Sequence, residues 1–208
     1  MTKIIPGILE KDFSEIQKKV QLVKPHVDRV HIDILDGTFV PYESFCNPAE
    51  LRTLPITLEL HLMIQRPEFV IRKWGALPNV DRLIVHLETV SNAQEILHLI
   101  HKTGKQAGFA VNPESRIPTL QNPLRETDMM LIMGVDPGQS GQPMLPDSVE
   151  KLKEACKLFP EKVVSFDGGV RIENVRVIRE AGASEIVVNS ALFHAPDIAE
   201  ALQYLCGQ

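Results

Sequence analysis

His31-Ile32-Asp33 lies in a short apolar run that is typical of a β-strand. Side chains alternate between the two sides of a strand, so the histidine and the aspartate point to one side and the isoleucine points to the other. His61 and Asp167 each stand at the end of another run of the same kind. If these strands are parallel neighbours in one barrel, their polar side chains converge at its C-terminal mouth.

Eight short runs of apolar or alternating residues are spread along the chain, and each predicts a strand. Longer amphipathic patterns between them predict helices, three of which follow the capping residues Asp12, Asn92 and Asp147. The expected strands cover residues 4–8, 29–34, 57–62, 82–86, 106–111, 129–134, 163–167 and 185–189. The expected helices include residues 13–23, 67–74, 93–102, 148–158, 172–181 and 196–205.

Strict alternation of strands and helices implies right-handed parallel crossovers. Eight such units in 208 residues match the lower end of the size range of a (β/α)8 TIM barrel. A doubly wound open sheet is the rival fold, but it rarely has so many evenly spaced units, and no G-x-G-x-x-G follows the first run. The sequence therefore predicts an α/β protein with a single (β/α)8 barrel domain over residues 1–208.

The composition argues against several classes of protein. The chain is 44% hydrophobic, enough for one well-buried core, and its net charge of −5 offers no basic surface for nucleic acid or anionic lipid. No apolar run reaches the length of about 18 residues that a membrane span needs, and the start lacks a signal-peptide pattern. Cys46, Cys156 and Cys206 are too widely spaced to suggest disulfides or a thiolate zinc site. We expect a cytoplasmic protein with neither nucleic-acid nor membrane partners.

His31, Asp33, His61 and Asp167 are candidate ligands of one divalent metal ion. Taken singly, each is more often a hydrogen-bonded polar residue at a strand end. That reading explains poorly why all four stand at the ends of strands that meet in one barrel. Imidazole and carboxylate ligands suit zinc, iron, manganese or cobalt better than magnesium, and zinc is the first expectation.

Segments that follow three of the expected strands, two of them containing glycine, indicate a substrate pocket. Gly168-Gly169 and Asn189-Ser190 stand where barrels form phosphate sites from backbone N–H groups, although tight turns would also use glycine. The loop 136–142 is either a segment that closes over substrate or a solvated loop. His86, with Glu88 nearby, either lines the pocket or supports it from behind.

The order of these motifs resembles the ribulose-phosphate 3-epimerase family. The resemblance runs from residue 5 to residue 193, so it covers almost the whole chain. Its matching stretches are Ile5-Pro6-Gly7-Ile8-Leu9, residues 31–41, Leu60-His61-Leu62-Met63, Asn112-Pro113, Leu131-Ile132-Met133, residues 135–138 with Gly141-Gln142, Asp167-Gly168-Gly169-Val170 and Ser190-Ala191-Leu192-Phe193.

The resemblance implies a metal-dependent isomerase of the pentose phosphate pathway that acts on a ketose phosphate. It would interconvert D-ribulose 5-phosphate and D-xylulose 5-phosphate by two-base proton transfer at C3 through a metal-stabilised enediolate. The family's metal-binding set maps onto His31, Asp33, His61 and Asp167, and the two aspartates would be its acid and base. Members form dimers or hexamers, so the resemblance also implies a homo-oligomer.

Other family positions would shape the substrate pocket. Met63, Met133 and Leu35 match positions that line it, the last replacing a family methionine. The expected substrate- and phosphate-binding positions are Gly138, Gly141, Gly168, Gly169, Asn189 and Ser190.

The chain departs from the family pattern at Gly7 and Gly134, where serine is usual, at Gln139, and at Asn189, where glycine is usual. Asparagine tolerates positive φ better than other non-glycine residues, so the phosphate loop can keep its shape. These departures bear on substrate choice and rate more than on the type of reaction.

Two alternatives use the same barrel. A D-allulose-6-phosphate 3-epimerase would need the same four residues, and a non-catalytic sugar-phosphate-binding barrel would have no need of two opposed carboxylates. A decarboxylase with the D-x-K-x-x-D motif is disfavoured, because Leu35 stands where its lysine would be.

Overall fold

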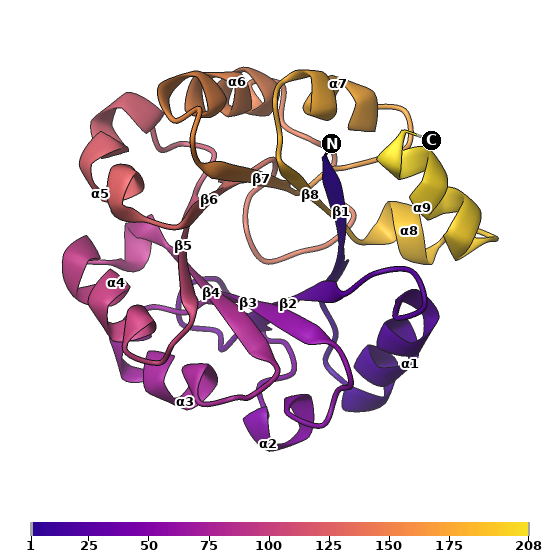
Figure 1. Cartoon of the computed structure of the whole chain (residues 1–208), viewed down its shortest axis with the longest axis horizontal. Helices are drawn as coiled ribbons and strands as arrows, with labels where there is room; N and C mark the ends of the chain where they lie inside the picture. Colours follow the sequence, from indigo (N-terminus) through magenta and orange to yellow (C-terminus); the bar gives the residue numbers. More distant parts are fainter. Residues whose placement is uncertain (1, 208) are drawn as a thin grey trace.

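Eight parallel strands close into a barrel in chain order, and β8 pairs back with β1. The computed structural model describes residues 2–207. Figure 1 looks along the barrel and shows the helices as a ring around the strands. The predicted (β/α)8 barrel is therefore confirmed. The strands are β1 (Lys3–Ile8), β2 (Arg29–Leu35), β3 (Thr57–Met63), β4 (Val80–His86), β5 (Gln106–Val111), β6 (Met129–Met133), β7 (Val163–Asp167) and β8 (Glu185–Val188).

Helices of different lengths connect the strands. The α-helices are α1 (Phe13–Val23), α2 (Pro48–Leu51), α3 (Ile71–Gly75), α4 (Ala93–His101), α5 (Gln121–Glu126), α6 (Ser148–Leu158), α7 (Val175–Glu180), α8 (Ser190–Phe193) and α9 (Ile198–Cys206). Three 3-10 turns, η1 (Pro67–Phe69), η2 (Leu87–Thr89) and η3 (Ile117–Leu120), add to them. None of the helices between residues 2 and 207 is long and apolar enough to cross a membrane.

Differences from the predicted elements have local causes. The helix expected over residues 67–74 is divided into η1 and α3, and the left-handed residue Arg66 (φ 63°) precedes it. The helix expected over residues 172–181 begins only at Val175, because the Asn174 side chain accepts a hydrogen bond from the Arg171 N–H. The short helices α2 and α5 were not expected, because one or two turns next to prolines leave no amphipathic period.

The three predicted caps behave differently. Asn92 caps α4, and its side chain accepts a hydrogen bond from the Glu95 N–H at 3.2 Å. Asp12 and Asp147 also stand at the N-cap positions of α1 and α6, as predicted, but their side chains make no capping hydrogen bond. For Asp147 the reason is its helical backbone (φ −87°, ψ −2°), since a capping side chain needs an extended residue.

The barrel interior is divided into a polar and an apolar part. Residues that face outward from the strands, such as Ile32 and Leu60, are buried against the helices and form the main core. Inside the barrel, an apolar cluster includes Ile84, Leu131 and Val187. Buried polar and charged side chains of the strands are His31, Asp33, Glu59, His61, Arg82, His86, Ser165 and Glu185. Because β2, β3 and β4 are neighbours, most of this polar set lies on one side of the barrel.

Candidate active site

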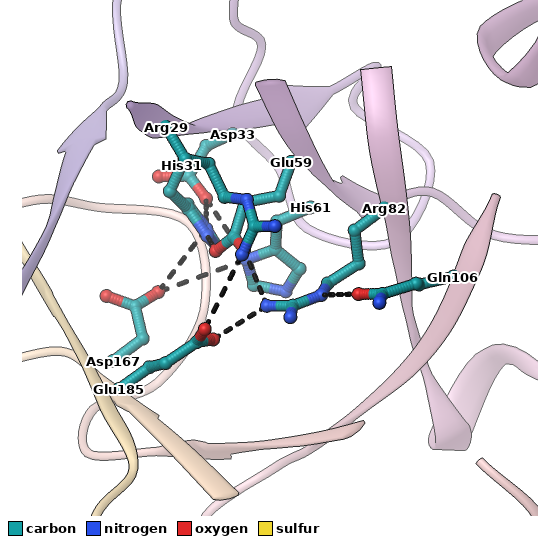
Figure 2. A network of polar contacts seen from close by, with 9 residues as sticks. All are labelled: Arg29, His31, Asp33, Glu59, His61, Arg82, Gln106, Asp167 and Glu185. Atoms are coloured by element: carbon teal, nitrogen blue, oxygen red, sulfur yellow. Dashed lines mark hydrogen bonds and ion pairs between the residues drawn. The ribbon is translucent and has the colours of Figure 1, made fainter. Parts of the chain in front are cut away.

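The four predicted ligands meet at the C-terminal end of the barrel. His31 Nε2 and His61 Nδ1 lie 3.2 and 3.0 Å from Asp33 Oδ1, and each lies 3.9 Å from Asp167 Oδ2. Figure 2 shows the two imidazoles and the two carboxylates turned toward one another. Asp33 is the register partner of His61, and Asp167 arrives from β7 across the barrel.

The spacing of these atoms fits a divalent metal ion. One ligand atom from each of the four residues lies within 4.8 Å of the other three. Nitrogen and oxygen ligands about 2.0–2.2 Å from a metal lie roughly 3.0–3.6 Å from one another. The contacts of Asp33 fall in that range and those of Asp167 lie slightly beyond it. Two imidazoles and two carboxylates also form a donor set that transition metals favour.

The two aspartates differ in their electrostatic surroundings. Burial opposes the charge on Asp33, but hydrogen bonds to His31 and His61 outweigh it and hold the pKa of its carboxyl well below the usual range. Burial raises the pKa of Asp167 to about 7, and the carboxylates of Asp33 and Glu59 act in the same direction against His31. Burial also lowers the pKa of His61 to about 4. The surroundings thus favour the ionised form of Asp33 and the protonated form of Asp167.

A network of buried ion pairs lies beneath the four ligands. Glu59 Oε1 lies 2.7 Å from His31 Nδ1, and its second oxygen accepts a hydrogen bond from Arg82 Nη1 at 2.8 Å. The same Arg82 nitrogen donates to Glu185 at 2.6 Å, and Arg82 Nε donates to Gln106 at 3.2 Å. Figure 2 shows Glu59, Arg82, Glu185 and Gln106 linked to one another in the interior of the barrel, next to His31. The network therefore reaches from the barrel floor to a candidate ligand.

The sequence alone predicted no role for the residues of this network. Glu59 and Arg82 lie inside β3 and β4, and Glu185 begins β8. All three are buried and alternate in register with interior residues of their strands, which are His61, Ile84 and Val187. Their inward position on the strands is the feature of the sequence from which these residues could have been found. Their pairing was not predictable from spacing, because 103 positions separate Arg82 from Glu185.

A pocket above the ligands contains most of the predicted substrate-contacting residues. Asp33 and Asp167 line its base, and Met63 and Met133 line it as expected. So do all six predicted substrate- and phosphate-binding positions, Gly138, Gly141, Gly168, Gly169, Asn189 and Ser190. Leu35 does not line the pocket; its buried side chain packs with Val40 and Met63 beside it.

The backbone of the segments after β7 and β8 allows other groups to approach it closely. Gly168 (φ 106°) and Gly169 (φ 68°) are both left-handed, and a Cβ on Gly169 would lie 2.4 Å from the Met144 backbone. Asn189 has φ −108°, so the tolerance of asparagine for positive φ is not needed at this position. Ser190 begins α8 immediately after it.

At two positions where the chain departs from the family pattern, neighbouring atoms occupy the space that a serine side chain would need. A Cβ on Gly7 would lie 2.7 Å from Val187 Cγ1, and one on Gly134 would lie 2.4 Å from the Gly168 carbonyl oxygen. Serine at either position therefore requires its neighbours to move. Gly7 and Val187 both line the pocket, so the wall of this pocket is apolar where the family pattern has a hydroxyl.

Comparison with known proteins adds independent observations. A model of the "Ribulose-phosphate 3 epimerase family" matches residues 3–193. The curated ribulose-phosphate 3-epimerase of Synechocystis sp. is 34% identical, with 96% of this chain and 90% of the relative covered. That of Bacillus subtilis is 32% identical, with 100% and 99% covered. A solved 3-hexulose-6-phosphate synthase from Salmonella typhimurium superposes with a TM-score of 0.75 at 16% identity, covering 99% of this chain and 97% of its own, which supports the barrel fold alone.

Proposed function

Since the chain belongs to the ribulose-phosphate 3-epimerase family, we propose that its site interconverts D-ribulose 5-phosphate and D-xylulose 5-phosphate. The chain is thus an isomerase of pentose phosphate metabolism. The observation that carries the mechanism is that Asp33 on β2 and Asp167 on β7 reach one pocket from two separate strands. Inversion at a carbon needs a proton removed from one face and returned to the other, so it needs two such groups.

Proton transfer falls to the two aspartates. A hydrogen on the carbon next to a ketone is too weakly acidic for a carboxylate alone at neutral pH. A divalent metal held by His31, Asp33, His61 and Asp167 would supply a Lewis acid for the negative charge that develops on the substrate oxygens. Asp33, with its low pKa, removes the proton, and Asp167, with a pKa of about 7, delivers one to the opposite face. The roles exchange when the other epimer is bound.

The remaining residues of the pocket would bind and enclose the substrate. We assign the phosphate to the main chain at Gly168, Gly169, Asn189 and Ser190, which lie together at one end of the pocket. Zinc is the proposed metal, with iron, manganese and cobalt as alternatives, because imidazole ligands suit all four. Assembly as a dimer or hexamer stays a prediction from the family resemblance.

Removal of the metal is expected to lower the turnover of D-ribulose 5-phosphate by at least about 10³-fold, since a Lewis acid supplies several kcal/mol of transition-state stabilisation. Purified protein is assayed before and after chelation, and then with Zn²⁺, Co²⁺, Mn²⁺ or Fe²⁺ restored. Thermal unfolding of the chelated protein controls for loss of structure. Full turnover at a metal content near zero would contradict the proposal.

The same assay separates the alternative substrates. Faster turnover of D-allulose 6-phosphate than of D-ribulose 5-phosphate would identify the longer sugar phosphate as the substrate. Silence on both sugars with every metal, together with tight binding of a ketose phosphate, would identify a binding protein instead.

Gly138→Ala is expected to reduce kcat/KM by about tenfold, because the loop 136–142 must keep its shape to enclose substrate. Gly138 has φ 116°, and a Cβ there would lie 2.6 Å from the Tyr42 ring. Gly104→Ala is the matched control, since Gly104 is also left-handed (φ 76°) but has open space around its Cβ position. Steady-state kinetics of the two variants test the idea, and unchanged kinetics in Gly138→Ala would remove the loop from substrate enclosure.

A further inference from the structure

We propose that His86 is a positioning residue of the metal site, which accepts the Nε2 proton of His61 and so fixes the tautomer of that ligand. His86 is the last residue of β4 and is fully buried. It is not among the residues that line the pocket. The inference rests on the proposed function, because it concerns a ligand of the proposed metal.

The contact between the two imidazoles requires one donor and one acceptor. His61 Nε2 lies 2.8 Å from His86 Nε2, which is a hydrogen-bond distance. The two ring planes are 21° from parallel and their centroids are 4.8 Å apart. A neutral imidazole has one N–H and one lone pair, so only one of these two nitrogens carries the shared proton.

The position of the other His61 nitrogen decides which ring donates. His61 Nδ1 faces the carboxylates and lies 3.0 Å from Asp33 Oδ1. A nitrogen that binds a metal must be free of its proton. The proton of His61 therefore sits on Nε2, and His86 Nε2 accepts it.

The surroundings of His86 favour the matching tautomer. Once its Nε2 is an acceptor, its own proton belongs on Nδ1. Within residues 2–207 that nitrogen has no hydrogen-bond partner, and the Glu88 carboxylate lies 3.7 Å away. Glu88 is held there by the Asn112 N–H at 2.9 Å and the Ser115 hydroxyl at 2.5 Å. A fixed negative charge at this distance favours an N–H over a lone pair.

The two histidine ligands thus have different supports. His31 places Nδ1 2.7 Å from the Glu59 carboxylate and turns Nε2 to the site. On the side of His61 that faces away from the site, Nε2 reaches the Glu88 carboxylate only through the imidazole of His86. His86 Nε2 accepts the proton of His61, and His86 Nδ1 carries the proton of His86. Neither nitrogen of His86 is therefore free to bind the metal. Loss of such a support typically weakens metal binding without removing any ligand.

Cobalt binding tests this role without any need for turnover. Metal-free protein is titrated with Co²⁺, and its affinity and absorption spectrum are compared among variants. His86→Leu removes the acceptor and is expected to weaken Co²⁺ binding about 10–100-fold. His86→Gln keeps an acceptor oxygen and is expected to recover most of that loss. Ile84→Val is the matched control, since Ile84 is fully buried two residues earlier on the same strand and belongs to the apolar cluster.

Nitrogen-15 NMR of the zinc-loaded wild-type protein shows which nitrogen of His61 carries the proton. This second measurement does not depend on whether any variant folds. A His61 ring protonated at Nε2 supports the proposal, and one protonated at Nδ1 overturns it. Equal Co²⁺ affinity in wild type and His86→Leu also overturns it, as does a His86→Gln variant that loses affinity as fully as His86→Leu. Wild-type protein that binds no Co²⁺ would overturn the proposed metal site and this inference together, whereas unaltered binding in a turnover-competent His86→Leu variant would overturn this inference alone.

Discussion

Asp33→Asn and Asp167→Asn are each expected to lower kcat for epimerisation by at least about 10³-fold, within the range that a lost general acid or base costs. An amide has nearly the shape of the carboxylate but neither accepts nor delivers the proton. It also removes a negative charge from the set of candidate ligands. Initial rates on D-ribulose 5-phosphate measure the loss, and circular dichroism shows whether the barrel persists.

Deuterium exchange distinguishes the two aspartates. Each variant keeps one carboxylate, so in D2O it is expected to exchange the C3 hydrogen of one epimer without inverting the carbon. Asp12→Asn is the matched control, because Asp12 is exposed and its side chain makes no capping bond. Near-normal turnover in either site variant would remove that residue from acid–base duty.

The candidate ligands were predictable because their positions depend only on local rules. A strand alternates its side chains, and parallel strands of a barrel end at one mouth, so four polar residues at strand ends had to lie near one another. The structure brings His31, Asp33, His61 and Asp167 together as this argument requires. The same rules located all eight strands, with ends that differ by two residues at most, as at the start of β4.

The supports behind those ligands depend on contacts across the barrel, which no local rule describes. Glu59 was visible as a charge inside an apolar strand, but its partner Arg82 comes from the next strand and Glu185 from the opposite end of the chain. For His86 the sequence left two interpretations open. The 2.8 Å contact with His61, together with its absence from the pocket lining, favours the supporting role.

These supports link catalysis to the stability of the barrel interior. Burial opposes charge on Glu59, but His31 and the guanidinium groups of Arg82 and Arg29 outweigh it and hold the pKa of its carboxyl below the usual range. Burial likewise opposes the charge on Arg82, and the carboxylates of Glu59 and Glu185 overcome it and raise its pKa. Each charge is therefore tolerated in the interior only because its partners are present.

Arg82→Met is accordingly expected to lower the free energy of unfolding by about 3–5 kcal/mol, because it removes the closer guanidinium group that Glu59 and Glu185 share. Arg29 stays farther away, 3.9 Å from Glu59 and 3.5 Å from Glu185. Arg82 is only 4% exposed and Glu59 is fully buried, so water cannot replace the lost hydrogen bonds. Denaturant unfolding at neutral pH measures the change.

A second substitution and a surface control separate this effect from a general loss of packing. Adding Glu185→Gln to Arg82→Met removes one unpaired charge and is expected to recover part of the stability. Arg176→Met is the control, because Arg176 pairs with Glu180 at 2.7 Å on the exposed face of α7 and such pairs contribute little. If Arg82→Met unfolded at the same denaturant concentration as the parent, Glu59 would be stable in the interior without Arg82. The contact between Glu59 and His31 would then not depend on Arg82. The ion pairs of the barrel floor would in that case contribute neither to the stability of the protein nor to the position of His31.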